Sequence, residues 1–226
     1  MSMEYKDVLE RLREEREKKA WTQKEISQHI CMGQAQYCKI EKGTQNFSYD
    51  EVKALTNLEI DVHYIFTGQR SNGYFIEKIE KGNYAKAIGL LEMIFAVIKY
   101  YYTWEPSVYW KKLYEEIKFV RFLDADQNYN NNLYYIIRCI EHYTQKEMAA
   151  CLGIDVKKLR RLETGQCLPD SELLWRFYNE FRVPPSVIIK DKKGILCEAG
   201  WLLEKVDSKI GKNSLAMMKT YFVKNE

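Results

Sequence analysis

Apolar residues recur at steps of three and four along most of the chain, and this spacing predicts amphipathic helices. Two short helices are predicted near the N-terminus, at residues 22–30 and 34–43. A longer helix is predicted at residues 84–102, another at 106–123 with Pro106 in its first turn, and a last one at 195–206. We therefore expect an all-α fold.

The segment that holds the first two short helices occurs twice, at a constant offset of 122 residues (144 − 22) and without a gap. Its polar matches are Arg16 with Arg138, Thr22-Gln23-Lys24-Glu25 with Thr144-Gln145-Lys146-Glu147, Glu41 with Glu163 and Gly43 with Gly165. Its apolar matches are Ile26 with Met148, Ile30 with Leu152, Tyr37 with Leu159 and Ile40 with Leu162. Agreement of both kinds at one offset indicates a structural repeat.

Each copy carries the local signals of a helix pair. Thr22 and Thr144 are favourable N-caps, and the glutamate three residues after each completes a capping box. Ser27 and Ala149 place a small side chain where two steeply crossing helices approach each other, as a helix-turn-helix requires.

Glycines mark the turns of these helix pairs. Gly43 and Gly165 follow the second helices and suit left-handed C-caps. Gly153 suits a turn with positive φ between the two helices of the second copy. The first copy has Cys31 at that position, which makes its turn less comfortable.

These residues resemble the Cro/repressor-type (XRE) helix-turn-helix family. The resemblance is carried by Arg16, Thr22-Gln23-Lys24-Glu25-Ile26-Ser27 and Ile40-Glu41-Lys42-Gly43, and by Arg138, Thr144-Gln145-Lys146-Glu147-Met148-Ala149 and Leu162-Glu163-Thr164-Gly165-Gln166-Cys167-Leu168-Pro169. The first copy departs from the family at Cys31 and at Phe47, which stands where the second copy has the family-like Pro169. The second copy has valine and lysines where the family often carries small polar reading residues.

The resemblance implies two lambda-repressor-like helix-turn-helix domains joined by a helical middle region. The implied division is a helix-turn-helix domain at residues 1–70, a helical linker or dimerisation region at 71–130, a second helix-turn-helix domain at 131–193 and a C-terminal helical extension at 194–226.

The implied function is a sequence-specific regulator of transcription, a repressor, that inserts the second helix of each pair into the major groove of double-stranded DNA. Helical spacing exposes Gln34, Gln36 and Lys39, and the family analogy points to Gln34, Ala35 and Lys39 as base readers. Glutamine can pair with adenine, and lysine can donate to guanine. Gln23 and Gln145 resemble the family residue that anchors a backbone phosphate, next to a helix N-terminus that favours the anion. The candidate DNA-contacting residues are Thr22, Gln23, Gln34, Ala35, Gln36, Lys39, Lys42, Thr144, Gln145, Val156, Lys157, Lys158, Arg160 and Arg161.

Charge separates the two copies. The whole chain carries a net charge of +3, which does not by itself point to nucleic acid. Residues 1–70 hold eleven Lys and Arg against twelve Asp and Glu, whereas residues 132–193 hold eleven against eight. The second copy therefore has the more favourable field for DNA, while the first has the more readable helix. The two signals disagree, and either copy is open as the main reader.

Several classes of protein are disfavoured. The N-terminus lacks an apolar secretory core and no apolar run is long enough to cross a bilayer, so a cytoplasmic protein is expected. The six cysteines form no CxxC pair, which predicts reduced thiols and no metal site. No phosphate-binding loop or nucleophile elbow is present, so we expect neither enzymatic activity nor a cofactor.

Three questions stay open at this level. The aromatic residues between Tyr100 and Tyr114 fit core packing or a helix–helix dimer surface better than a nucleic-acid stacking platform or a ligand pocket. A homodimer through the middle or C-terminal helices suits palindromic operators, although one chain with two readers can also clamp a site alone. The alternative function is a protein-interaction module, such as an antitoxin-like or antirepressor-like protein.

Turns are predicted at Ser71-Asn72-Gly73, at Gly82-Asn83 and, with charged residues, from Lys190 to Gly194. A flexible Asn-rich join is predicted from Asp124 to Asn132.

Overall fold

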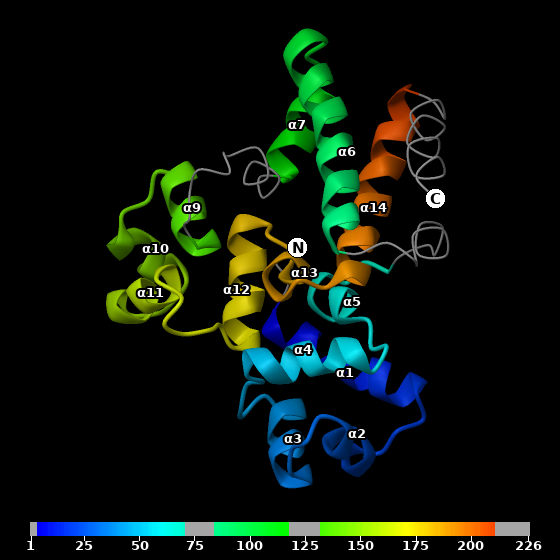
Figure 1. Ribbon diagram of the computed structural model, residues 1–226, viewed down its shortest axis with the longest axis vertical. Helices are drawn as coiled ribbons and strands as arrows, with labels where there is room; N and C mark the ends of the chain where they lie inside the picture. The colour runs from blue at the N-terminus through cyan, green and yellow to red at the C-terminus, as the bar shows by residue number, and fades with distance from the viewer. Residues whose placement is uncertain (1–3, 71–83, 118–131, 211–226) are drawn as a thin grey trace.

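The computed structural model describes residues 4–70, 84–117 and 132–210, and every regular element in these ranges is a helix (Figure 1). The all-α prediction is confirmed for this part of the chain. We call the N-terminal helices the first five-helix set. It comprises α1 (Tyr5–Lys18), α2 (Gln23–His29), α3 (Gln34–Glu41), α4 (Tyr49–Asn57) and α5 (Val62–Thr67).

Another group of helices, here the second five-helix set, follows the same plan. It comprises α9 (Leu133–Ile140), α10 (Gln145–Cys151), α11 (Val156–Glu163), α12 (Ser171–Phe181) and α13 (Pro185–Ile189). Helices α10 and α11 begin and end 122 residues after α2 and α3 (145 − 23, 163 − 41). The start of α12 and the end of α13 keep the same offset from α4 and α5 (171 − 49, 189 − 67). The gapless sequence repeat is thus also a repeat of helix boundaries.

The repeated apolar residues form the interior of their sets. All eight predicted positions are buried: Ile26, Ile30, Tyr37 and Ile40 in the first set, and Met148, Leu152, Leu159 and Leu162 in the second. Burying a side chain of this size contributes about 1.5–3 kcal/mol. The spacing of apolar residues by three and four positions therefore correctly predicts which face of each short helix is buried.

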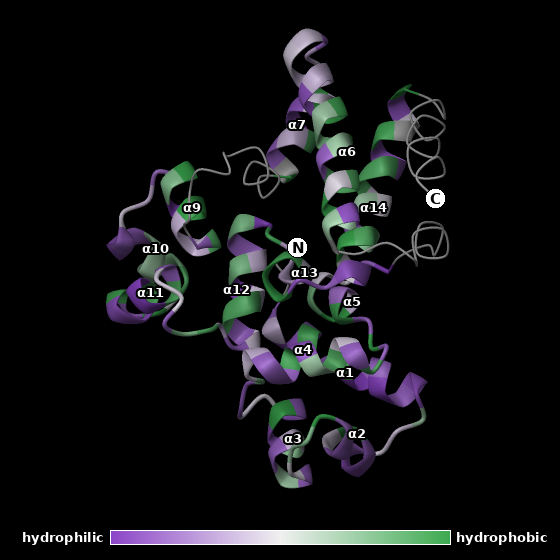
Figure 2. Ribbon diagram, in the orientation of Figure 1, coloured by the Kyte–Doolittle hydropathy of each residue, from purple (hydrophilic) through white to green (hydrophobic). Residues whose placement is uncertain are grey.

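Three further helices complete the described fold. They are α6 (Tyr84–Trp104), α7 (Val108–Glu116) and α14 (Lys192–Ile210). Helices α6 and α14 pack side by side (Figure 1), and their apolar residues join those of the second five-helix set in one cluster. Figure 2 shows hydrophilic residues concentrated on α1 and α2, and apolar residues gathered where α12, α13 and α14 meet.

The aromatic residues of the middle region pack α7 against α6. Tyr101 stacks on Trp110 with ring centroids 4.7 Å apart, and Tyr102 stacks on Tyr114 at 4.1 Å. Trp110 is buried, whereas Trp104, at the end of α6, is 73% exposed. These contacts agree with the preferred interpretation of core packing, and the homodimer stays a prediction.

The predicted start of the helix after α6 is wrong by two residues. Helix α7 begins at Val108, and the hydroxyl oxygen of Ser107 accepts a hydrogen bond from the backbone amide of Trp110 at 3.4 Å. Pro106 therefore precedes the N-cap. A serine oxygen supplies the acceptor that a proline cannot, and this sets the boundary. The predicted extent is also wrong, because α7 ends at Glu116 with Ile117 as its C-cap, and residues 118–123 lie outside the described residues.

The predicted charged turn from Lys190 to Gly194 is also wrong in its extent. Only Lys190, with φ 58°, and Asp191 connect α13 to α14, and Gly194 lies in the first turn of α14. A Cβ added to Gly194 would lie 2.5 Å from Cβ of Ser186. The glycine thus allows α13 and α14 to approach closely, and it does not mark a break in the helix.

Several other sequence expectations fall outside the described residues. They are the turns at Ser71-Asn72-Gly73 and Gly82-Asn83, and the Asn-rich join as far as residue 131. Within the described ranges, no helix is both long and apolar enough to cross a membrane. In the same ranges, no group of three or more His, Cys, Asp and Glu side chains is placed to hold a metal ion.

Candidate nucleic-acid interface

Helices α2 and α3 form a helix pair joined by a short turn. Thr22 caps α2: its hydroxyl oxygen accepts from the backbone amide of Glu25 at 3.2 Å, and a carboxylate oxygen of Glu25 accepts from the amide of Thr22 at 2.7 Å. The Glu25 carboxylate also accepts from the hydroxyl of Thr22 at 2.8 Å, and the bonds from the amide and the hydroxyl of Thr22 lower the pKa of this carboxyl, with the amide bond as the largest cause. Ser27 is buried where α2 meets α3, as its small size predicts. Thr144, Glu147 and the buried Ala149 repeat this arrangement in the second set.

The turns between the paired helices share a left-handed residue. It is Cys31 in the first set, with φ 56°, and Gly153 in the second, with φ 63°. Over the second turn, Nη1 of Arg176 donates to the carbonyl oxygen of Leu152 at 2.9 Å, and a Cβ on Gly153 would collide with that guanidinium. The first set has Ala54 at the position equivalent to Arg176 (176 − 122), so a side chain at residue 31 is tolerated.

The outer face of α3 is open. Gln34, Ala35 and Lys39 are exposed, and Lys42 is exposed just after the helix. Gln36 is partly buried because its side-chain amide donates to a carboxylate oxygen of Glu51 on α4 at 3.2 Å. The predicted readers Gln34, Ala35 and Lys39 therefore share one accessible surface, and Gln36 lies at its edge.

The outer face of α11 is strongly basic. Lys157, Arg160 and Arg161 are exposed, while Val156 is partly buried against the apolar cluster. Nζ of Lys158 lies 3.4 Å from a carboxylate oxygen of Asp170. Cationic donors thus dominate this surface, and they suit phosphate or guanine.

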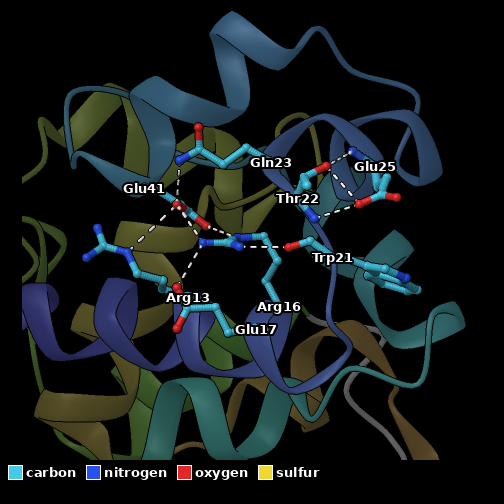
Figure 3. A network of polar contacts seen from close by, with 8 residues as sticks. All are labelled: Arg13, Arg16, Glu17, Trp21, Thr22, Gln23, Glu25 and Glu41. Carbon is cyan, nitrogen blue, oxygen red and sulfur yellow. Dashed lines mark hydrogen bonds and ion pairs between the residues drawn. The ribbon is translucent and has the colours of Figure 1, made fainter.

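A buried carboxylate links three helices of the first set (Figure 3). Oε1 of Glu41 accepts from Nε of Arg16 at 2.7 Å, and Oε2 accepts from the side-chain amide of Gln23 at 2.8 Å. Arg13 lies 3.8 Å from the same carboxylate, and Nη1 of Arg16 donates to the carbonyl oxygen of Trp21 at 2.8 Å. Burial alone lowers the pKa of Arg16, but the hydrogen bond and charge of Glu41 outweigh it and raise this pKa. The network fixes α2 and α3 relative to α1.

The second set repeats this network. Nε of Arg138 donates to Oε1 of Glu163, and the amide of Gln145 donates to Oε2 of Glu163 at 2.7 Å. The hydrogen bond to Glu163 is the largest cause of the raised pKa of Arg138. The oxygen of the Gln145 side chain then accepts from Nε of Arg160 at 2.9 Å. Gln145 therefore connects the buried carboxylate to the basic surface of α11.

The sequence interpretation assigned Gln23 and Gln145 to phosphate and did not include the glutamates that position them. In the structure each glutamine holds a fixed orientation at the start of its helix because its amide nitrogen is bound to a buried carboxylate. The signal was present in the repeat, since Arg16 and Glu41 recur together as Arg138 and Glu163. Two opposite charges retained at one spacing indicate a buried ion pair.

Comparison with protein families finds a match to the segment that contains the first helix pair. The family model described as helix-turn-helix matches residues 12–58, which begin within α1 and end just after α4. The curated proteins and the solved structures give no match to the chain. Residues 12–58 are therefore similar to a helix-turn-helix domain, as the sequence of the first copy predicts.

Proposed function

We propose that the chain is a sequence-specific regulator that binds double-stranded DNA through two helix-turn-helix domains. The first domain comprises residues 1–70 and reads bases with Gln34, Ala35 and Lys39 of α3. The second comprises residues 131–193 and meets the duplex with the basic face of α11. The proposal keeps residues 71–130, in which α6 and α7 are described, as the region between the two domains, and residues 194–226, which include most of α14, as a C-terminal extension. A repressor role is part of the proposal, because occupancy of an operator alone can exclude other proteins. A location in the cytoplasm is also part of the proposal.

The observation that carries the proposal is the repeated buried network behind an exposed polar helix. In each set a glutamate whose side chain is at most 5% exposed holds an arginine and the first-turn glutamine, so the two helices are fixed relative to each other. The polar outer residues of the second helix stay exposed: Gln34, Ala35 and Lys39 on α3, and Lys157, Arg160 and Arg161 on α11. A preorganised polar surface of this kind loses little conformational entropy on binding.

Selection of sequences from random duplex oligonucleotides, with the purified full chain, tests the proposal. A regulator enriches one motif, and its affinity falls steeply with salt because phosphate contacts release counterions. The affinity for one selected duplex is then measured from 50 to 300 mM salt. Absence of an enriched motif together with a flat salt response would contradict DNA binding and favour the partner-binding alternative.

A further inference from the structure

The two five-helix sets are packed against each other through the same helices. At the offset of 122 residues, α4 is equivalent to α12 and α5 to α13. The structure brings α5 into contact with α12, α4 with α13, and α5 with α13. Exchanging each helix for its equivalent turns the first contact into the second and leaves the third unchanged. This exchange is the signature of an isologous interface, in which two copies of one surface meet around a two-fold axis.

The side chains show that this interface is well packed. Leu174 of α12 and Ile189 of α13 are buried in the apolar core of the first set. The hydroxyl of Tyr49 on α4 donates to the carbonyl oxygen of Ile188 at 3.2 Å. A core shared in this way fixes the two sets as one body.

Hydrogen bonds between the two five-helix sets also hold them together. The hydroxyl groups of Tyr5 and Ser171 are 2.6 Å apart, and the backbone amide of Phe47 donates to Oγ of Ser171 at 3.0 Å. The side-chain amide of Asn46 donates to a carboxylate oxygen of Glu172 at 3.0 Å. The residues just before α4 are therefore anchored directly to the first turn of α12.

The candidate reading helices lie on either side of this interface. Figure 1 shows α3 and α11 at two separate outer ends of the molecule, with α4 and α12 between them. Seven residues lie between the end of α3 and the start of α4 (42–48), and seven lie between α11 and α12 (164–170). Each candidate reading helix is thus joined to the shared interface by a connecting segment of the same length, here called its arm.

We propose that a single chain binds DNA as an internal pseudo-dimer, with α3 and α11 in two inverted, non-identical half-sites of fixed spacing. This inference rests on the proposed function. Equivalent positions differ in chemistry: Ala35 stands against Lys157, and Lys39 against Arg161. Each half-site therefore has its own sequence, and the operator is a degenerate inverted repeat.

The same contacts argue against a homodimer formed through α4 and α5. The surface that these helices would offer to a second chain is occupied by α12 and α13 of the same chain. In a helix-turn-helix dimer, half-sites lie about 10–10.5 bp apart, centre to centre. One chain replaces that dimer, and its two arms cannot adjust their spacing independently.

The test uses the full chain and the duplex obtained by selection. The stoichiometry of the complex is measured by sedimentation, and the protected bases by footprinting. We expect one chain per duplex and two protected half-sites. Inserting about 5 bp between the half-sites turns them to different faces of the helix. The affinity should then fall about 100-fold or more, because the gain from linked binding is lost.

Two controls make the result specific. Substituting 5 bp outside the half-sites should leave the affinity unchanged, and Lys39→Ala should relax the sequence preference in one half-site while leaving the other half-site as it is. Two chains per duplex, a single protected half-site, or full tolerance of the insertion would overturn the pseudo-dimer while leaving sequence-specific binding intact. Failure of the selection itself would instead remove the proposed function.

Discussion

Phe47 and Ser171 are joined by a reciprocal pair of hydrogen bonds, one of which is accepted by the side chain of Ser171. The amide of Phe47 donates to Oγ of Ser171 at 3.0 Å, and the amide of Ser171 donates to the carbonyl oxygen of Phe47 at 2.9 Å. The equivalent of Phe47 in the second set is Pro169 (169 − 47 = 122), which has no amide hydrogen. The departure from the family-like proline in the first set therefore has a structural reason, since residue 47 must donate to the other set.

Ser171→Ala should destabilise the chain by about 1–3 kcal/mol, because it leaves the buried amide of Phe47 without an acceptor. The measurement is urea unfolding with an unchanged dependence on denaturant. Thr44→Ala is the control: its exposed hydroxyl donates only to the carbonyl oxygen of Lys39, and the loss should stay below about 0.5 kcal/mol. Equal losses in the two variants would contradict the role given to Ser171.

Cys31→Gly should stabilise the chain by about 0.5–1 kcal/mol. A non-glycine residue with positive φ is strained by about 1–2 kcal/mol, and part of the gain is offset by the greater freedom of glycine in the unfolded chain. The midpoint of urea unfolding is the readout.

Gly153→Ala is the matched substitution in the other turn, and it should destabilise by about 1–3 kcal/mol. It introduces the same strain and also displaces the guanidinium of Arg176 from the carbonyl oxygen of Leu152. If both substitutions shift the midpoint in the same direction, the left-handed turns do not control stability.

The helices of the candidate interface are among the best predicted parts of the fold, and the reason is local. Capping threonines, the apolar steps and Gly43 each act within a few residues, so the bounds of α2 and α3 follow from the chain itself. One wrongly predicted boundary, from Lys190 to Gly194, depends on a contact between two helices, whereas the other, at Pro106, is set locally by the N-cap Ser107. By sequence Gly194 is typical of a turn, whereas in the structure it lies within α14 and packs against Ser186 of α13.

The packing of the two sets could not be predicted for a related reason. An apolar step pattern reports that a helix face is buried, but not which helix covers it. Leu174 belongs to α12 of the second set, yet the structure places it in the core of the first set. The hydrogen bonds of Gln23 and Gln145 could likewise not be predicted from the sequence, because their partners Glu41 and Glu163 lie 18 residues away in the chain.

Glu198→Gln should change how stability depends on pH. Glu198 of α14 is buried with its carboxylate 3.7 Å from Nε2 of His63 on α5. Burial raises the pKa of Glu198 from its usual 4.5 to about 7, although the charge of Lys205 opposes this shift. Burial also lowers the pKa of His63 to about 4.

The signs of the two effects differ. A raised carboxyl pKa means that stability is lost as the pH rises from 4.5 through 7, because the unfolded chain ionises first. A lowered histidine pKa means that stability is lost as the pH falls from 6.5 towards 4. The glutamine variant keeps only the second effect. It should match the parent chain near pH 4.5 and exceed its free energy of unfolding at pH 8 by up to about 3 kcal/mol, since a tenfold change in proton affinity is worth about 1.4 kcal/mol. A constant difference across this range would exclude Glu198 as the titrating group.

Lys39→Ala and Gln23→Ala should affect DNA binding in different ways. Lys39 is exposed on the outer face of α3, so its loss should relax the preference at one base pair by about 1–3 kcal/mol. Gln23 begins α2 and is held by Glu41, so its loss should weaken all sequences about equally. Parallel selections with the two variants are compared with the parent chain. An unchanged motif for Lys39→Ala would remove α3 as a base reader.

The combined substitution of Lys157, Lys158 and Arg161 by alanine should flatten the salt dependence of DNA binding. Each phosphate contact contributes about −0.9 to the slope of log K against log salt concentration. Lys157 and Arg161 are exposed, whereas Lys158 already lies 3.4 Å from Asp170, so we expect the slope to fall by about 2 to 3. The matched control replaces Lys6, Lys111 and Lys193, three exposed cations on α1, α7 and α14. Both variants lose three positive charges. A general effect of net charge therefore changes the two slopes alike, and only direct contact between α11 and the DNA backbone separates them.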